Sequence, residues 1–273
     1  MQERVTDAAT RRTPRVLSIA GSDSGGGAGI QADLKAFAAA GVHGMTAITA
    51  ITAQNTLGVI DIHPIPPATI IAQVKAIADD IGVDAVKIGM LGDQPTIEAV
   101  ATALDLIPDT PIVIDPVMVS ESGARLLTEH AVGTLRELLI RRATVVTPNV
   151  PEALVLVGGD QDQRPARLAE EIHLLGPRAV VVTGGHREDA IDTFYDGNQL
   201  VEIPGPRHAD GATHGSGCTH SSTLAAWLAR GADPLTAAKH AKDAASEAVR
   251  QGLRDIGRGP GPVDVLGVGT RLS

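Results

Sequence analysis

Short runs of aliphatic and β-branched residues alternate along this chain with longer stretches that have helical spacing, and this alternation constrains the fold more than any other feature. The strand-like runs lie at residues 15–20, 45–52, 85–88, 112–114, 144–146 and 179–182. The helix-like stretches have apolar residues at i, i+3 and i+4, and lie at residues 30–40, 68–80, 96–106, 128–139 and 164–175. Because the strand-like runs are continuously apolar, they predict a parallel sheet that helices cover on both faces.

Three further segments complete the predicted α/β fold. Residues 190–203 carry Asp-Gly-Asn at their middle, which is typical of a small β-hairpin inserted into the alternation. Residues 217–230 and 234–253 have the pattern of two closing helices. No linker or shift in composition divides the chain. We therefore expect a flexible N-terminal tail at residues 1–14 and one domain at residues 15–273.

The composition argues against several classes of partner. The aromatic residues are Phe37, Phe194, Tyr195 and Trp227, so the core must consist mainly of Val, Ile, Leu and Ala. The chain has 23 Lys and Arg against 32 Asp and Glu, and this net charge of −9 argues against a nucleic-acid partner. No run approaches the roughly 20 apolar residues of a membrane span. A single cysteine, Cys218, fits a reducing compartment, so we expect a cytoplasmic protein.

Polar and glycine-rich clusters follow each of the six strand-like runs. They are GSDSGGGAG at 21–29, AQN at 53–55, GM at 89–90, DPVM at 115–118, TPNVPE at 147–152 and TGGH at 183–186. The carboxyl ends of parallel strands meet at one edge of a sheet, which is where open α/β folds bind their ligands. The sequence therefore predicts a ligand site at this edge.

The glycine-rich loop at 21–29 leads from the first strand-like run into a helix. Such a loop can present backbone N–H groups to an anion or let a ligand approach closely, and a plain connecting turn is the alternative. It contains neither the G-x-G-x-x-G of dinucleotide-binding proteins nor the Gly-Lys of a P-loop. Asp33, one turn into the helix, is either a first-turn acid favoured by the helix dipole or a residue of the site.

The segment HGSGCTHSS at 214–222 precedes an apolar helix. The backbone N–H groups of residues 215–218 would lie at the positive end of that helix, where they can stabilise negative charge that develops during phosphoryl transfer. The same position favours the thiolate form of Cys218, although a lone cysteine is also typical of a small buried apolar residue. His214 and His220 lack credible partner ligands for a metal.

Two acidic positions have a structural and a functional interpretation. Asn149 precedes a helix and Glu152 follows three residues later, which is the pattern of a capping box. With a nucleotide nearby, Glu152 would instead hold Mg²⁺ through water while Asn149 fixes the phosphate end. Asp115, which stands before a proline, is either a turn residue or a second acid of the same site.

Taken in order, GSDSGGGAGIQADLK, TAQNT, KIGML, DPVM, TPNVPEA, GGH and HGSGCT resemble the phosphomethylpyrimidine kinases of thiamine biosynthesis over residues 15–262. The resemblance implies a three-layer α/β/α ribokinase-like fold with a mostly parallel sheet. It implies a homodimeric, ATP- and Mg²⁺-dependent kinase that phosphorylates 4-amino-5-hydroxymethyl-2-methylpyrimidine and then its monophosphate. Both steps would use one site.

The same resemblance implies roles for individual residues. The pyrimidine pocket would be lined by Gly21, Asp33, Gln54, Met90 and Val117, with the amide of Gln54 on the aminopyrimidine edge. The nucleotide would be held by Asn149, Glu152, Thr183 and Gly185. Mg²⁺ would be held, in part through water, by Glu152 and Asp115. Catalysis would involve Gly215, Ser216, Gly217 and Cys218, with Cys218 at the position where sugar kinases of the superfamily carry an aspartate base.

Two positions depart from the family pattern. Thr183 stands where many relatives have a lysine, which removes a cationic phosphate contact, and Ser216 replaces the more usual threonine without affecting the backbone N–H groups. The nearest alternative function is a pyridoxal or pyridoxine kinase on the same fold. An NAD(P)-binding oxidoreductase and a non-catalytic ligand-binding protein are further alternatives.

Overall fold

The computed structural model describes residues 12–120, 123–160, 162–185, 190–209 and 211–272. The strands are β1 (Arg15–Asp23), β2 (His43–Asn55), β3 (Gly58–Pro64), β4 (Ala85–Ile88), β5 (Ile112–Ile114), β6 (Val145–Val146), β7 (Ala179–Val182), β8 (Asp192–Tyr195) and β9 (Leu200–Ile203). The α-helices are α1 (Gly29–Ala39), α2 (Pro67–Asp80), α3 (Gln94–Leu104), α4 (Ala131–Leu138), α5 (Val150–Val157), α6 (Pro165–His173), α7 (Ser216–Ala229) and α8 (Pro234–Arg250). Two short 3₁₀ helices are η1 (Ile140–Arg142) and η2 (Gly269–Leu272). Residues 1–11 of the expected N-terminal tail lie outside the described residues.

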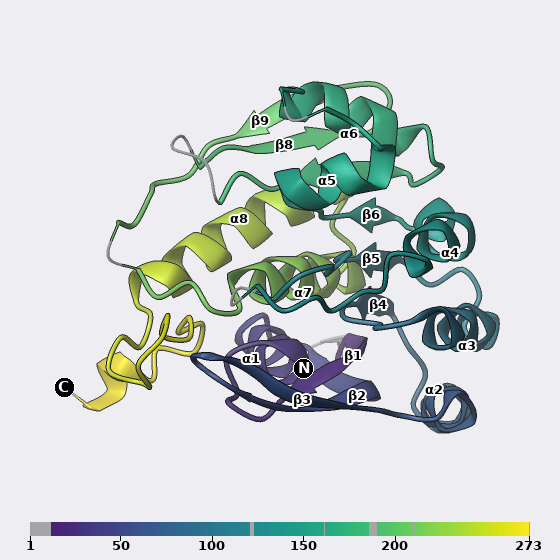
Figure 1. Ribbon diagram of the computed structural model, residues 1–273, viewed down its shortest axis with the longest axis horizontal. Helices are drawn as coiled ribbons and strands as arrows, with labels where there is room; N and C mark the ends of the chain where they lie inside the picture. Colours follow the sequence, from purple (N-terminus) through teal and green to yellow (C-terminus); the bar gives the residue numbers. More distant parts are fainter. Residues whose placement is uncertain (1–11, 121–122, 161, 186–189, 210, 273) are drawn as a thin grey trace, which may run out of the picture.

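The strands form one sheet in the order β3-β2-β1-β4-β5-β6-β7-β8-β9 (Figure 1). Strands β2, β1, β4, β5, β6 and β7 pair in parallel with one another. Strand β3 is antiparallel to β2, β8 is antiparallel to β7, and β9 is antiparallel to β8. The hairpin predicted at 190–203 is therefore confirmed, and it extends an edge of the same sheet. The parallel centre brings the carboxyl ends of β1, β4, β5, β6 and β7 to one edge.

Helices cover both faces of the sheet, as the continuous apolar strands predict. One core cluster joins the sheet to α2, α3, α4, α5 and α6, and a second joins the opposite face to α1, α7 and α8. Both clusters are mostly aliphatic, and Phe37 and Phe194 are the fully buried aromatic side chains among the largest of the core. The three-layer arrangement is visible in Figure 1.

The structure differs from the sequence prediction mainly at β2 and β3. Strand β3 was not predicted, because it lies at the sheet edge and its apolar residues are exposed rather than buried. Strands β1 and β2 continue beyond their apolar runs to Asp23 and Asn55. The first part of the glycine-rich segment and the whole of AQN therefore belong to strands. No helix in the described parts of the chain is both long and apolar enough to cross a membrane.

Candidate functional site

The loops at the carboxyl edge contact one another, as the sequence predicts. The backbone N–H of Thr183, after β7, donates to the carbonyl oxygen of Pro148, after β6, at 2.9 Å. His214, in the loop before α7, lies 3.1 Å through its Nε2 from the Oδ2 of Asp23, at the end of β1. These contacts link loops that are far apart in the sequence into one surface around the beginning of α7.

Asp23 organises the glycine-rich loop from within. Its buried carboxylate accepts hydrogen bonds from the backbone N–H groups of Gly25, Gly27 and Ala28 at 2.8 to 3.0 Å. Burial raises the pKa of Asp23, but the hydrogen bonds from His214 and the backbone outweigh it and hold the pKa below its usual value. These three N–H groups are thus occupied by a carboxylate of the chain, so they do not form the open anion site that the glycine run suggested.

The glycines of this loop instead permit close approach. A Cβ atom at Gly27 would lie 2.1 Å from the ring of His214, and one at Gly215 would lie 1.8 Å from the carbonyl oxygen of Gly27. Gly215 also has a φ of 86°, which disfavours any other residue. The loop after β1 therefore packs directly on the loop that begins α7, and close approach of a ligand to these glycines stays a prediction.

The predicted pyrimidine residues differ in exposure, because Gly21, Asp33 and Met90 are buried whereas the other two are partly exposed. A Cβ atom at Gly21 would lie 2.5 Å from the Cε of Met90, so these two residues share one wall. Gln54 and Val117 are partly exposed at the ends of β2 and β5. Ser24 ties the glycine-rich loop to Gln54, because its Oγ donates to the Gln54 carbonyl at 2.7 Å and accepts from the Gln54 N–H at 2.8 Å.

Asp33 lies beneath this surface rather than on it. It is completely buried, and its Oδ1 accepts from the ammonium of Lys87 at 2.8 Å and from Ser222 at 2.7 Å, while its Oδ2 accepts from Ser18 at 2.6 Å. It is also beyond the first turn of α1, so the helix-dipole interpretation is wrong. In this structure Asp33 supports α7 and the sheet from behind, and its contact with a pyrimidine stays a prediction.

Lys87 is a completely buried cation close to the beginning of α7. Burial lowers its pKa, but the charges of Asp33, Cys218 and Asp115 outweigh burial and raise the pKa above its usual value. Lys87 therefore carries a positive charge at neutral pH. That charge is felt by Cys218 and Asp115, whose pKa values it lowers against their own burial.

Asn149 and Glu152 form the predicted capping box. Glu152 N–H donates to Asn149 Oδ1 and Asn149 N–H donates to Glu152 Oε2, both at 2.9 Å. Asp115 is buried at the end of β5 and accepts from the hydroxyl of Ser221 at 3.0 Å. Burial, and then the charge of Asp115, raise the pKa of Glu152 to about 8, and burial likewise raises the pKa of Asp115.

This pair of acids fits a divalent cation that shares its coordination with phosphate and water. Two neighbouring carboxylates with raised pKa values repel each other, and a cation between them would relieve that repulsion. Among the described residues no group of three or more His, Cys, Asp or Glu could hold a metal by itself. Mg²⁺ needs only one or two carboxylates when phosphates and waters supply the other ligands.

Helix α7 begins beside these acids. A Cβ atom at Gly217 would lie 3.9 Å from Asp115 Oδ2. The backbone N–H of Ser216 donates to the carbonyl oxygen of Thr213. Gly217 and Cys218 lie in the first turn of α7, where helix geometry leaves backbone N–H groups without an intrahelical acceptor. Burial raises the pKa of the Cys218 thiol to about 12, despite the opposing charge of Lys87. Burial thus opposes the expected thiolate tendency, although the residue as a whole is half-buried, and that tendency stays a prediction.

The loop after β7 holds the remaining predicted nucleotide residues. Thr183 is partly exposed and pairs with Asn149 in an isolated parallel bridge, and Gly185 is exposed. His186, of the segment TGGH, lies outside the described residues. Thr183, Asn149 and Glu152 are thus brought together, and their contact with a nucleotide stays a prediction.

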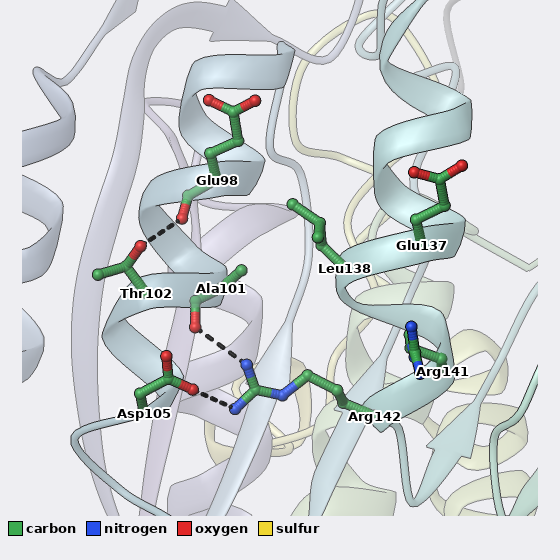
Figure 2. Close-up of a pocket in the computed structure, with 8 residues that line it drawn as sticks. All are labelled: Glu98, Ala101, Thr102, Asp105, Glu137, Leu138, Arg141 and Arg142. Carbon is green, nitrogen blue, oxygen red and sulfur yellow. Dashed lines mark hydrogen bonds and ion pairs between the residues drawn. The ribbon is translucent and has the colours of Figure 1, made fainter.

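A hollow of about 480 Å³ lies elsewhere, between α3 and the segment from α4 to η1 (Figure 2). The residues that line it are Glu98, Ala101, Thr102, Asp105, Glu137, Leu138, Arg141 and Arg142. Arg142 bridges the two helices through Asp105 and the carbonyl oxygen of Ala101. These residues lie at helix ends that lead into β5 and β6, so the hollow belongs to the opposite edge of the sheet and has none of the predicted site residues.

Sequence reasoning missed the buried charged residues behind the site. They are Asp23, Lys87, Asp192 and Lys242. Lys87 gave a usable signal, because a lysine inside a continuously apolar strand needs a buried partner. Its partner Asp33 is 54 residues away, and no local pattern identifies such a pair.

Comparisons with known proteins agree with this geometry. The sequence model of a family described as phosphomethylpyrimidine kinase matches residues 23–264. A hydroxymethylpyrimidine/phosphomethylpyrimidine kinase of Rhizobium meliloti (strain 1021) is 47% identical over 258 residues, which cover 92% of this chain and 96% of the relative.

Two solved structures show the same fold. A pyridoxal kinase of Bacillus subtilis, in complex with ADP, has a TM-score of 0.86 at 38% identity and covers 96% of this chain and 100% of its own. A phosphomethylpyrimidine kinase of Clostridium difficile 630 has a TM-score of 0.76 at 39% identity, and the match covers 86% of this chain and 99% of that kinase. The predicted ribokinase-like fold is confirmed, and the oxidoreductase alternative is removed.

Proposed function

The chain belongs to the phosphomethylpyrimidine kinase family, and from this premise we propose that it transfers the γ-phosphoryl group of ATP to the hydroxymethyl oxygen of 4-amino-5-hydroxymethyl-2-methylpyrimidine. We propose that the same site then phosphorylates the monophosphate to the diphosphate, as a step of thiamine biosynthesis. Use of ATP follows from the kinase family itself. The substrate rests on the names of the relatives.

One observation carries the proposal. The first turn of α7 lies beside the buried Asp115, whose charge acts on the buried Glu152, at the edge where the strand-end loops meet. N–H groups at a helix N-terminus favour negative charge, and acids with raised pKa values favour a cation. A phosphate with its counter-ion satisfies both preferences at once.

In the proposed mechanism, the chain mainly positions the reactants and stabilises charge. The hydroxymethyl oxygen attacks the γ-phosphorus in line, and the bond to the β-phosphate oxygen breaks, so that ADP leaves. The hydroxyl proton would pass to Cys218 as thiolate or, where the thiol stays neutral, to an oxygen of the transferred phosphoryl group. The N–H groups of Gly217 and Cys218 would stabilise the charge on the transferred phosphoryl oxygens. Asp115 and Glu152 would hold Mg²⁺, which neutralises phosphate charge when bound. A loose transition state demands little of a base, so a neutral thiol at Cys218 is compatible with transfer.

On the substrate side, Gly21, Gln54, Met90 and Val117 remain the proposed pyrimidine contacts. Asn149, Thr183 and Gly185 remain the proposed nucleotide contacts. Their support is their position at the carboxyl edge, where Gly21 meets Met90 and Asn149 meets Thr183.

The role of the Cys218 thiol can be tested separately from that of the backbone N–H groups in the first turn of α7. Replacing Cys218 by alanine preserves the N–H groups of the first turn and removes only the thiol. If the thiol takes part in proton transfer, Cys218→Ala lowers kcat while pyrimidine binding, measured by calorimetry, stays near normal. An unchanged kcat would remove the side chain from the mechanism and leave the backbone N–H groups.

A coupled assay of ADP formation tests the function. The acceptors are the free hydroxymethylpyrimidine, its monophosphate and pyridoxal, each with MgATP. The proposal expects turnover with the first two acceptors and a diphosphate product from the second. No turnover with any acceptor would favour the non-catalytic ligand-binding protein.

Pyridoxal kinase activity is the second candidate, because the Bacillus subtilis pyridoxal kinase covers this fold with a TM-score of 0.86. The same assay separates the two candidates by the ratio of kcat/KM for pyridoxal to kcat/KM for the pyrimidine. A ratio above one would make pyridoxal the preferred acceptor.

We also propose a homodimer that forms through the β3 edge of the sheet. This edge exposes large apolar side chains, among them Ile60 at 77%, Leu57 at 51% and Ile51 at 49%. An exposed apolar edge strand is a common docking surface. Light scattering should give twice the 28.1 kDa chain mass, and Ile60→Lys should halve it. A wild-type monomer would contradict this assembly.

The proposed location is the cytoplasm, with neither a nucleic acid nor a membrane as partner. Its support is the single cysteine and the net charge of −9. Cell fractionation followed by immunoblotting tests the location, and recovery in the membrane pellet would contradict it.

A further inference from the structure

A second buried charged cluster lies behind the loop after β7, and the proposed mechanism does not use it. Asp192, at the beginning of β8, is 2% exposed, and one of its oxygens, Oδ1, accepts from both the backbone N–H of Gly184 at 2.9 Å and the ammonium of Lys242 at 2.8 Å. Its other oxygen, Oδ2, lies 3.2 Å from Nε2 of His220. One carboxylate thus joins the loop after β7 to α7 and α8.

We infer that Asp192 is a positioning residue that holds the loop of Thr183 to Gly185 in place against the beginning of α7, so that nucleotide phosphates meet both at once. This inference deepens the proposed function and rests on it. Asp192 itself would touch no substrate. Its effect on the nucleotide would pass through Gly184 and His220.

The loop is fixed from two sides, and Asp192 supplies one of them. On the first side, Thr183 donates its N–H to Pro148 and pairs with Asn149. On the second side, the backbone N–H of Gly184 donates a hydrogen bond to Oδ1 of Asp192. The backbone of Gly184 also packs closely on the residue before the hairpin, because a Cβ atom there would lie 2.0 Å from the carbonyl oxygen of Ile191. The backbone at Gly184 is therefore clamped between the capping segment of α5 and the hairpin.

The charges of the cluster keep Asp192 ionised. Burial raises the pKa of Asp192, but His220 and Lys242 outweigh it and hold the pKa below its usual value. The ammonium of Lys242 lies within about 6 Å of the Gly184 nitrogen, since both contact the same oxygen. An ionised acceptor makes the Gly184 hydrogen bond stronger than a neutral one would.

His220 connects this cluster to the acids of the site. It lies in α7, two residues after Cys218, and it interacts electrostatically with Asp115 as well as with Asp192. The contact of its Nε2 with Asp192 is within ion-pair range but falls short of a hydrogen bond, and among the described residues neither ring nitrogen has a hydrogen-bond partner. A buried polar group without hydrogen bonds costs stability, so its presence beside Asp192 calls for an explanation other than stability.

Nucleotide affinity tests this role directly. The variants are Asp192→Ala, which removes the acceptor, and Asp192→Asn, which keeps an acceptor oxygen and the side-chain volume but removes the charge. Asp196→Ala is the matched control, because Asp196 also accepts backbone N–H groups in the same hairpin, at its exposed turn. The measurements are the Kd for MgADP by calorimetry, the KM for MgATP, the KM for the pyrimidine, and Tm.

We expect Asp192→Ala to weaken MgADP binding and raise the KM for MgATP by about tenfold or more, because a hydrogen bond to a charged group is lost. Asp192→Asn should have a smaller effect of the same kind, and Asp196→Ala should have none. The KM for the pyrimidine should change by less than about twofold.

The inference is overturned if folded Asp192→Ala binds MgADP like the wild type, or if both KM values rise together. If Asp192→Ala does not fold, Asp192→Asn decides the matter by the same criterion. Binding of MgADP needs no acceptor substrate, so failure of the wild type to phosphorylate the pyrimidine would sink the proposed function without sinking this inference. Wild-type protein that binds no MgADP would sink both.

Discussion

Two buried Asp–Lys pairs flank α7, and they are built differently. In both pairs the ammonium lies 2.8 Å from the carboxylate. The Asp33–Lys87 pair is completely buried, and both carboxylate oxygens accept from side chains of the core. In the Asp192–Lys242 pair about 10% of the lysine side chain is exposed, and Asp192 also accepts a hydrogen bond from the backbone N–H of Gly184 in the loop after β7.

This difference suggests that the two Asp–Lys pairs have different roles. The closed pair anchors α7 to α1, β1 and β4 from within the core. The open pair reaches the surface loop that would hold a nucleotide. Loss of the first should therefore damage mainly stability, and loss of the second mainly binding.

The largest expected effect is on stability, from Lys87→Met. Removing one partner of a buried pair leaves an uncompensated charge on Asp33, so the free energy of unfolding should fall by about 3–5 kcal/mol. Urea denaturation measures it. The control is Lys75→Met, in the exposed Lys75–Asp79 pair, which should change the free energy by less than about 1 kcal/mol. Equal effects of the two substitutions would break the distinction between a buried anchor and a surface pair.

Cys218 reports on the electrostatics beside the closed pair. With a pKa of about 12, its thiol should react with iodoacetamide at pH 8 about a thousandfold more slowly than an ordinary cysteine. Because the chain has one cysteine, mass spectrometry follows the reaction without interference, and the urea-unfolded chain is the reference. Similar rates in the folded and unfolded chains would show that the thiol is not desolvated as described.

Lys242→Met should have an intermediate effect on stability. In this variant Asp192 would still accept the hydrogen bond from the Gly184 N–H and would still lie beside His220. The site of the substitution is also not completely buried. The free energy of unfolding should fall by about 2 kcal/mol, less than for Lys87→Met. Denaturation of the two variants in the same buffer makes the comparison. A larger loss for Lys242→Met would reverse the proposed division between anchor and positioning cluster.

The smallest expected effect is that of Ser222→Ala. The substitution removes one hydroxyl donor from Asp33 while Lys87 and Ser18 remain, so a loss of about 1–2 kcal/mol is expected. Thr102→Ala is a suitable control, because its hydroxyl donates to a carbonyl oxygen on an exposed helix face. A stability equal to that of the wild type would show that Ser222 is not part of the anchor.

The sequence predicted those parts of the molecule that depend on neighbouring residues. Periodicity located the parallel strands and the helices that cover them, and the spacing of Asn149 and Glu152 predicted a capping box that the structure confirms. Strand β3 escaped because its apolar residues face outward at an edge. A pattern of burial cannot identify an element that is not buried.

The candidate site was predictable in place but not in its supporting contacts. The strand ends bring the expected loops together, and α7 begins at Ser216, one residue before the predicted beginning, with Gly215 as its N-cap. The glycine-rich loop was misread in part, because its N–H groups bind Asp23 within the same segment. Asp192 and Lys242 are 50 residues apart, so only the folded chain brings them together.

The first turn of α7 as the phosphate site is the central claim of this account, and a crystal structure with a non-hydrolysable ATP analogue, Mg²⁺ and the hydroxymethylpyrimidine tests it most directly. The account predicts the γ-phosphate oxygens within hydrogen-bond distance of the N–H groups of Gly217 and Cys218. Phosphates bound elsewhere, for example near Arg141 in the hollow between α3 and α4, would contradict it.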